Sequence, residues 1–391
     1  MTADKKWTRT IMKSIETQLF KGKMIVLYGP RQVGKTTMSR QLLSKYHSMG
    51  GYYSCDQLNV RQALLSQDAE TMRAFFDFSQ KILVLDEAQL TPDIGRSLKI
   101  MADSFPESQI IATGSSSFEL ANKINEPLTG RKREYFLYPL SLAEKYQIKI
   151  PHSKLAQDLI YGLYPEVASA ENAEDKRHIL RELASSYLYK DVLIYESVKS
   201  SELLDRLLRA LAFQIGGEIS YNELASGIGV DKKTIATYIG YLEKSFIVFR
   251  ITPFTKNRRD EIKKLRKIYF YDNGLRNMLI NNLNPIEYRD DIGGLWENMM
   301  IVERLKMQKN NGFFANNFYW RLHNNQEIDW VEEYGGRLYP YEFKWRRDAG
   351  KPTFFQETYP EAAKTVIVNR ENYRNFLTEG IADEDKPNLR P

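Results

Sequence analysis

The sequence is poor in residues that build covalent or metal-bound scaffolds. A single cysteine, Cys55, stands among 391 residues, which excludes an intrachain disulfide and fits a reducing compartment. The four histidines share no metal-binding spacing. No apolar run approaches the roughly 18–20 residues that span a bilayer, and residues 1–7 lack the apolar stretch of a signal peptide. We therefore expect a cytoplasmic protein with no membrane partner.

The net charge is small but concentrated. The chain has 56 Lys and Arg residues against 50 Asp and Glu residues, a formal charge of +6. Residues 244–270 alone hold nine basic and two acidic residues, so the remainder of the chain is slightly acidic. The nine are Lys244, Arg250, Lys256, Arg258, Arg259, Lys263, Lys264, Arg266 and Lys267. Such a cluster can neutralise nucleic-acid phosphates, or it can dock on an acidic face of its own chain.

Hydrophobic periodicity divides the chain into four parts. Short apolar runs alternate with polar helical stretches in the first part, a pattern typical of a parallel α/β sheet. A helical part follows, then a helix-turn-helix pattern with an apolar strand and a basic hairpin, and finally a second α/β unit. The second unit has the order helix, three strands, helix, strand. The expected boundaries are 1–150, 151–210 (a helical lid or linker), 211–271 and 286–380.

A phosphate-binding motif opens the first domain. Gly29-Pro-Arg-Gln-Val-Gly34-Lys35-Thr36 follows the apolar strand 24–28 and precedes a helical pattern, the context that this motif requires. The glycines let backbone N–H groups converge on phosphates at a helix N-terminus. We expect Lys35 to reach the β- and γ-phosphates of ATP and Thr36 to bind Mg²⁺. With Thr37, these residues form the predicted nucleotide site.

Two further strands supply the rest of that site. Asp86 follows the apolar run 82–85 of the strand 81–85, where a carboxylate would approach Mg²⁺, and Glu87 is predicted to activate the attacking water. The strand 109–113 runs into a serine cluster, so Thr113 or Ser115 is expected to sense the γ-phosphate, unless these are an ordinary strand end.

A basic turn completes the first domain. We predict that Arg131 stabilises charge on a nucleotide of its own chain or, in a homo-oligomer, of a neighbour, unless this turn is simply solvated.

A helix-turn-helix pattern lies beside the basic segment. Ser220 and Glu223 form a capping box, and Asp231 caps the helix 232–244. Its apolar stripe leaves other side chains facing outward, as in a DNA-recognition helix: Lys232, Lys233, Thr234, Thr237 and Tyr238. DNA contact is the prediction, and a packing or dimerisation module is the alternative.

The last α/β unit brings carboxylates and a lysine together. Glu342 and Lys344 share a strand face, and Asp329 lies on the adjacent hairpin arm. Two such carboxylates can hold Mg²⁺ or Mn²⁺, with Glu297 as a third ligand, and Lys344 can orient a water or stabilise phosphodiester charge.

These segments together resemble a known family. The sequences GPRQVGKTT, VLDEAQ, ATGSSS, LTGR and LYPLSLAE are similar to prokaryotic AAA-type P-loop ATPases with a winged helix and a C-terminal PD-(D/E)xK nuclease-like domain. The resemblance covers nearly the whole chain and implies a 5-1-4-3-2 strand order and Mg-ATP binding. It matches Glu297, Asp329, Glu342 and Lys344 to the nuclease motif, although Ile328 departs from the motif's Pro.

We therefore expect an α/β protein that acts as a Mg-dependent ATPase, a hydrolase coupled to DNA binding and to a nuclease-like domain. One alternative is a nucleotide-gated switch that binds DNA or a protein partner without cleavage. In that case the C-terminal α/β unit has the nuclease fold but serves only as a binding surface. Another is a transcription regulator that uses ATP as a signal.

Overall fold

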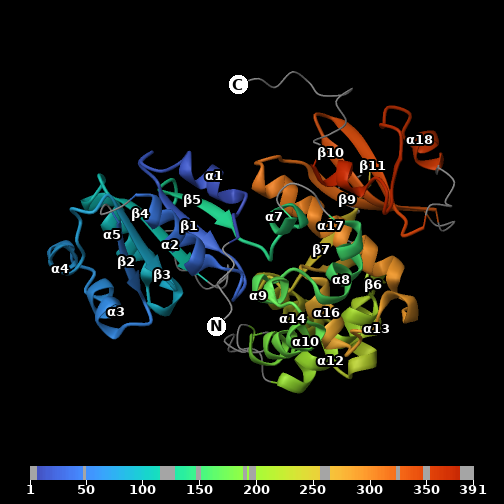
Figure 1. Ribbon diagram of the computed structural model, residues 1–391, viewed down its shortest axis with the longest axis horizontal. Coiled ribbons are helices and arrows are strands. Elements are labelled where there is room, and N and C mark those ends of the chain that lie inside the picture. The colour runs from blue at the N-terminus through green and yellow to red at the C-terminus, as the bar shows by residue number, and fades with distance from the viewer. Residues whose placement is uncertain are drawn as a thin grey trace.

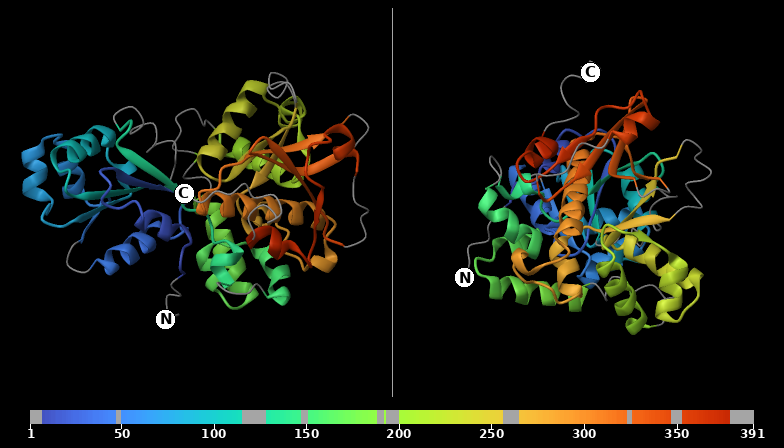
Figure 2. Two further views of the ribbon diagram at one scale, coloured as in Figure 1. Left: turned by 90° about the horizontal axis from the view of Figure 1, so that it is seen from above. Right: turned by 90° about the vertical axis from the view of Figure 1, so that its right-hand side faces the viewer.

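The computed structural model describes residues 7–46, 50–114, 128–146, 151–187, 192, 200–255, 265–322, 326–346 and 353–378. An N-terminal α/β unit lies beside a larger body formed by the rest of the chain (Figure 1). Seen from above, the two sheets of the molecule occupy opposite ends of its long axis (Figure 2).

The N-terminal unit is a parallel sheet. Its strands are β1 (Met24–Tyr28), β2 (Gly50–Ser54), β3 (Ile82–Asp86), β4 (Gln109–Gly114) and β5 (Lys132–Phe136). They lie in the order β2-β3-β4-β1-β5, and every neighbouring pair is parallel. This is the order that the resemblance implied.

Helices cover both faces of this sheet, so every residue of β1 and β3 is buried. The helices are α1 (Ile11–Glu16), α2 (Lys35–Lys45), α3 (Leu58–Leu65), α4 (Ala69–Phe75), η1 (Ala88–Leu90) and α5 (Ile94–Ser104). On one face Ile25 and Leu27 pack with the predicted stripe of α1, including Ile15. On the other, Val26 packs with residues of α3 and α5, among them Leu98.

A helical part follows β5. Its elements are α7 (Leu142–Tyr146), α8 (His152–Tyr161), α9 (Pro165–Ser169), α10 (Ala173–Glu182), η2 (Leu183–Tyr187) and α12 (Ser201–Phe213). The apolar stripe of α12 and Leu180 of α10 lie in the same core as one face of the N-terminal sheet. The helical part is therefore packed onto the rest of the molecule.

The helix-turn-helix forms with the predicted caps. Helix α13 (Tyr221–Ile228) begins where Ser220 Oγ accepts the Glu223 N–H (3.3 Å), and α14 (Lys232–Lys244) where Asp231 Oδ1 accepts the Thr234 N–H (2.9 Å). One residue differs from the prediction. Tyr238, expected to face outward, is buried, because packing against α13 and β7 widens the apolar stripe to include its position.

The remaining strands build one seven-stranded sheet. They are β6 (Glu218–Ile219), β7 (Val248–Pro253), β8 (Arg266–Phe270), β9 (Asn316–Arg321), β10 (Glu327–Tyr334), β11 (Arg337–Phe343) and β12 (Val366–Val368), in the order β12-β11-β10-β9-β7-β8-β6. The helices of this region are α16 (Asn273–Leu279), η3 (Ile286–Tyr288), α17 (Ile292–Asn310), α18 (Phe354–Thr358) and α19 (Tyr373–Thr378). The C-terminal order α17-β9-β10-β11-α18-β12 is the predicted one.

The boundary predicted between 271 and 286 does not separate two sheets. Strand β7 pairs in parallel with β9, so that Thr252 lies opposite Phe318. This pairing joins the strands that follow the helix-turn-helix to the C-terminal strands. The two predicted units therefore share one sheet.

Candidate functional site

The phosphate loop connects β1 to α2 at the carboxyl edge of the N-terminal sheet. Gly34 has φ = 92°, a left-handed conformation that favours glycine, and it stands immediately before the helix. A Cβ on Gly29 would lie 2.2 Å from the Leu137 carbonyl oxygen. Both glycines of the motif are thus required by the path of the backbone.

Lys35 is folded back onto its own loop. Its Nζ donates to the carbonyl oxygens of Gly29 and Pro30, both at 2.9 Å, and the side chain is buried. The ammonium group therefore stands inside the loop that would surround the phosphates, where it can exchange carbonyl oxygens for phosphate oxygens.

The Asp86 carboxylate accepts hydrogen bonds from hydroxyl groups of three elements. It accepts from Thr36 Oγ1 at 2.7 Å, and also from Tyr52 on β2 and Thr113 on β4. Burial, and next the hydrogen bond to Asp86, raises the pKa of Tyr52 to about 12, so this hydroxyl remains a donor. The oxygens of Thr36 and Asp86 are hard donors at hydrogen-bond distance from each other, which fits a Mg²⁺ ion.

Glu87 has an unusual backbone conformation. Its φ of 54° and ψ of 42° are left-handed, a state that non-glycine residues adopt mainly at constrained or functional positions. The Glu87 N–H donates to Thr113 Oγ1 (3.1 Å), and its carboxylate accepts from the Gln89 amide. Thr113 thus touches both predicted acidic residues.

The structure brings most of the predicted nucleotide residues together and leaves one aside. Gly34, Lys35, Thr36, Thr37, Asp86 and Glu87 line a single cleft. Arg131 instead precedes β5 at the opposite, amino edge of the sheet, where its Nε pairs with Asp103 Oδ1 (2.7 Å). Ser115 lies outside the described residues.

The cleft, of about 1790 Å³, extends from the phosphate loop to the helical part. Its far wall includes Lys145, Lys154, Glu166 and Lys176, from α7, α8, α9 and α10 respectively. Sequence reasoning missed these residues, because nothing in their local pattern indicates that they face a nucleotide site.

Comparison with known proteins agrees with this geometry. Residues 21–146 match the family model of an AAA domain. This part of the chain is similar to AAA-type P-loop ATPase domains. Residues 152–285 and 292–382 match two families described as domains of unknown function, DUF8612 and DUF4143.

The relatives share most of the chain. An uncharacterized protein of Mycobacterium tuberculosis is 26% identical over 329 residues, covering 83% of this chain and 71% of that protein. One from Methanocaldococcus jannaschii is 23% identical over 348 residues, covering 83% and 76%. A Walker-type ATPase of Pyrococcus abyssi matches 72% of this chain and 96% of its own, with a TM-score of 0.47 and 17% identity. Among the described residues, no helix is both long and apolar enough to cross a membrane.

The predicted C-terminal residues also meet. Lys344 Nζ lies 2.5 Å from Glu342 Oε1, and Asp329 Oδ2 accepts the Phe343 N–H at 2.8 Å. Burial, together with the neighbouring charge of Asp329, raises the pKa of Glu342 to about 7. We call Glu297, Asp329, Glu342 and Lys344 the carboxylate–lysine cluster.

Lys267 of β8 occupies the centre of this region. Its side chain is buried, with Nζ 3.0 Å from Glu297 Oε1 and ion-paired with Glu327. The Tyr269 hydroxyl donates to the same Glu297 oxygen at 2.6 Å. The carboxylates around it hold the pKa of Lys267 well above its usual value, despite burial, so it stays charged.

This lysine lies beside one of the predicted metal ligands, Glu297, Asp329 and Glu342. Within the described ranges, no group of three or more His, Cys, Asp or Glu side chains is arranged to hold a metal ion. The Lys267 ammonium pairs with the carboxylate of Glu297, the predicted third ligand. The sequence places Lys267 next to Arg266 in a basic segment, so nothing local distinguishes it from the cations predicted to contact phosphates.

The basic segment is less available than its composition indicates. Lys267 is buried, and Arg250 is held by Glu243, whose Oε1 accepts from the Arg250 Nε at 2.7 Å. Five of the nine cations lie outside the described residues: Lys256, Arg258, Arg259, Lys263 and Lys264.

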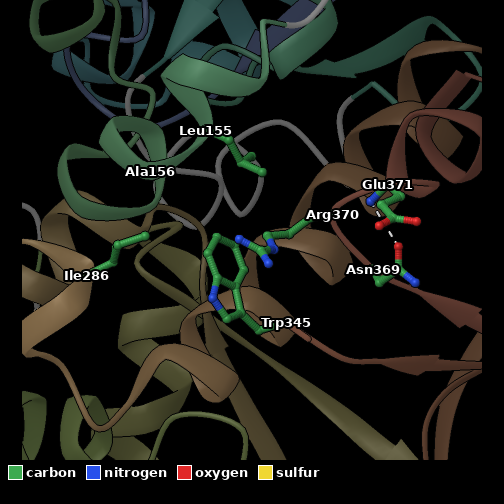
Figure 3. Close-up of a pocket in the computed structure, with 7 residues that line it drawn as sticks. All are labelled: Leu155, Ala156, Ile286, Trp345, Asn369, Arg370 and Glu371. Carbon is green, nitrogen blue, oxygen red and sulfur yellow. Dashed lines mark hydrogen bonds between the residues drawn. The ribbon is translucent and has the colours of Figure 1, made fainter. Parts of the chain in front are cut away.

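A smaller pocket of about 290 Å³ lies between residues of α8 and of the C-terminal unit (Figure 3). Leu155 and Ile286 approach it from one side, and the guanidinium of Arg370 covers the ring of Trp345 at 4.8 Å. Trp345 directly follows Lys344, but the pocket contains none of the predicted site residues.

We predict that Lys267→Met destabilises the protein by about 3–5 kcal/mol, because it leaves Glu297 and Glu327 without their buried cation. Urea unfolding would measure the loss. The double variant Lys267→Met/Glu297→Gln should be more stable than Lys267→Met alone, since one unpaired charge is removed. A loss below about 1 kcal/mol, the range of a surface ion pair, would contradict the buried-pair interpretation.

Proposed function

We propose that this protein is a Mg-dependent ATPase. The observation that carries the proposal is the convergence of Lys35, Thr36, Asp86 and Glu87 on one cleft at the carboxyl edge of a parallel sheet. This is where P-loop sheets bind ligands, and the matched AAA domain is consistent with it.

Each residue has a role that follows from its position. Lys35 exchanges its two loop carbonyls for phosphate oxygens, and the loop amides at the start of α2 stabilise phosphate charge. Thr36 and Asp86 would hold Mg²⁺, which supplies charge neutralisation when bound. Glu87 accepts the proton of the attacking water, and Thr113, bonded to Asp86 and to the Glu87 backbone, fixes the orientation of that pair.

The helical part acts as a lid in this proposal. It supplies the far wall of the cleft, so nucleotide bound there would touch both units. In contrast, Arg131 lies at the other edge of the sheet, so it would serve only the nucleotide of a neighbouring subunit in a homo-oligomer.

The second proposed activity is DNA binding through the helix-turn-helix, as in a winged helix. Lys232 and Lys233 are exposed at the start of α14, and Thr237 is exposed one turn later. This is the end from which a recognition helix contacts DNA. The basic segment 244–270 begins at the end of this helix and would add phosphate contacts.

For the C-terminal unit, the structure favours a binding role over cleavage. The nuclease hypothesis requires that Glu297, Asp329 and Glu342 bind Mg²⁺ or Mn²⁺. The Glu297 carboxylate is instead paired with the Lys267 ammonium. We therefore propose a nucleotide-gated switch that binds DNA, with the carboxylate–lysine cluster as a structural element.

Lys35→Ala should abolish ATP binding and hydrolysis, because the phosphate charge loses its cation. Glu87→Gln should bind ATP normally but turn over about 10²–10⁴-fold more slowly, since only the proton acceptor is lost. Phosphate release and fluorescent-nucleotide titration measure the two effects. Glu70→Gln, an exposed carboxylate of the same domain, is the matched control. Undiminished turnover in Glu87→Gln would refute its assigned role.

DNA affinity should fall steeply with salt, measured by fluorescence anisotropy. Removing Lys232 and Lys233 together should lower the slope of log K against log[salt] by about 1.8, the value for two phosphate contacts. The double variant Arg96→Ala/Lys99→Ala removes the same charge from an exposed face of α5 and should leave the slope unchanged. A flat salt response of the wild type would contradict DNA binding.

No DNA cleavage is expected from the wild type with Mg²⁺ or Mn²⁺, with or without ATP, in gel assays of single- and double-stranded DNA. Metal-dependent cleavage that disappears in both Glu342→Ala and Lys344→Ala would overturn the switch proposal and establish a nuclease site.

A further inference from the structure

Arg9 reaches from the N-terminal segment into the phosphate loop. Its side chain is 5% exposed. Nη1 donates to the Val33 carbonyl at 2.7 Å, and Nη2 donates to the Tyr138 carbonyl at 2.6 Å. One guanidinium thus ties the loop to the segment that follows β5.

The Val33 carbonyl matters because it belongs to the same peptide unit as the Gly34 N–H. This peptide bond is trans, so its C=O and N–H point in opposite directions. Since Arg9 holds the oxygen, the Gly34 amide must face away from Arg9. At the start of α2, that amide is one of the N–H groups that the phosphate motif presents to an anion.

The Arg9 charge is already matched. Nε lies 3.2 Å from Glu144 Oε1, and Glu144 is 3% exposed. The same carboxylate accepts from the Thr10 N–H (2.8 Å) and the Ser141 N–H (2.9 Å), which fixes it in place. Arg9 thus donates from two nitrogens to two carbonyls, with Glu144 as its counter-ion, an arrangement that the single ammonium of lysine cannot reproduce.

We propose that Arg9 is a positioning residue for nucleotide binding. It fixes the Val33–Gly34 peptide in the orientation that binds the β-phosphate of a nucleoside di- or triphosphate, and Glu144 fixes Arg9. This inference rests on the proposed ATPase function, and it adds a residue that stands outside the phosphate motif.

Substitution of Arg9 should weaken the binding of any nucleotide that has a β-phosphate, whether or not it also has a γ-phosphate. A loosened loop has to be ordered by the nucleotide itself, so binding weakens while the saturated complex stays competent. Arg9→Lys and Arg9→Gln should therefore raise the Kd of ADP and of ATP alike by about tenfold, the equivalent of one charged hydrogen bond. The KM for ATP should rise in parallel, with kcat close to that of the wild type.

Glu144→Gln provides a milder variant, because it keeps both carbonyl bonds of Arg9 and removes only the ion pair. It should also raise the Kd of ADP, but by less than the Arg9 variants do. Arg73→Lys and Arg73→Gln make the same substitutions at an exposed arginine of the same domain and should change neither constant. Thermal unfolding without nucleotide confirms that each variant is folded.

The outcomes separate the two proposals. Failure of the wild type to bind ADP or ATP would refute the ATPase function. Wild-type binding together with unchanged Kd values in both Arg9 variants would overturn the positioning role alone. A loss confined to ATP would also overturn it, because it would mean that Arg9 contacts the γ-phosphate directly. A fall in kcat at unchanged KM would indicate loss of active protein and would likewise count against it.

Discussion

The carboxylate of Asp86 is the constraint around which the nucleotide site is built. It is buried at the carboxyl edge of the sheet, where an unpaired charge would be costly. Three hydroxyl groups from α2, β2 and β4 satisfy it, so that Thr36, Tyr52 and Thr113 are drawn to one point. Through Thr113 the same arrangement fixes the backbone of Glu87. A single charge thus determines the relative positions of the phosphate loop and the proposed catalytic carboxylate.

In the second half of the molecule, a buried positive charge has the corresponding role. Lys267 is a buried cation that cannot stand alone, and Glu297 and Glu327 surround it from α17 and β10. Since Lys267 belongs to β8, this contact binds the strands after the helix-turn-helix to the C-terminal unit, in addition to the pairing of β7 with β9. The two predicted domains therefore form one body whose interior includes an ionic contact.

The N-terminal sheet was predictable because its information is local. Apolar runs, the glycines of the loop and the residues at strand ends predict β1, β3 and β4, and the resemblance implied the order of the sheet. Sequence reasoning failed where a contact joins distant segments. The pairing of β7 with β9 and the ion pair of Lys267 with Glu297 leave no periodic trace. Tyr238 was misplaced for the same reason, since its burial depends on which elements pack against α14.

Buried polar contacts connect Arg9 of the nucleotide site to the helix that carries Glu297. Glu144, which holds Arg9, also accepts from the N–H of Ser141, and the next N–H, that of Leu142, donates to Glu303 Oε2 at 2.7 Å. Glu303 lies on α17, six residues after Glu297 and therefore about 9 Å along the same helix.

These contacts form a buried path between two parts of the fold. Arg9 donates to the Val33 carbonyl of the phosphate loop and pairs with Glu144, and the segment 141–144 is tied to Glu303 of α17. Breaking one buried charged hydrogen bond costs about 1.5–3 kcal/mol. The phosphate loop and the helix that carries Glu297 are therefore held in place by one set of buried contacts.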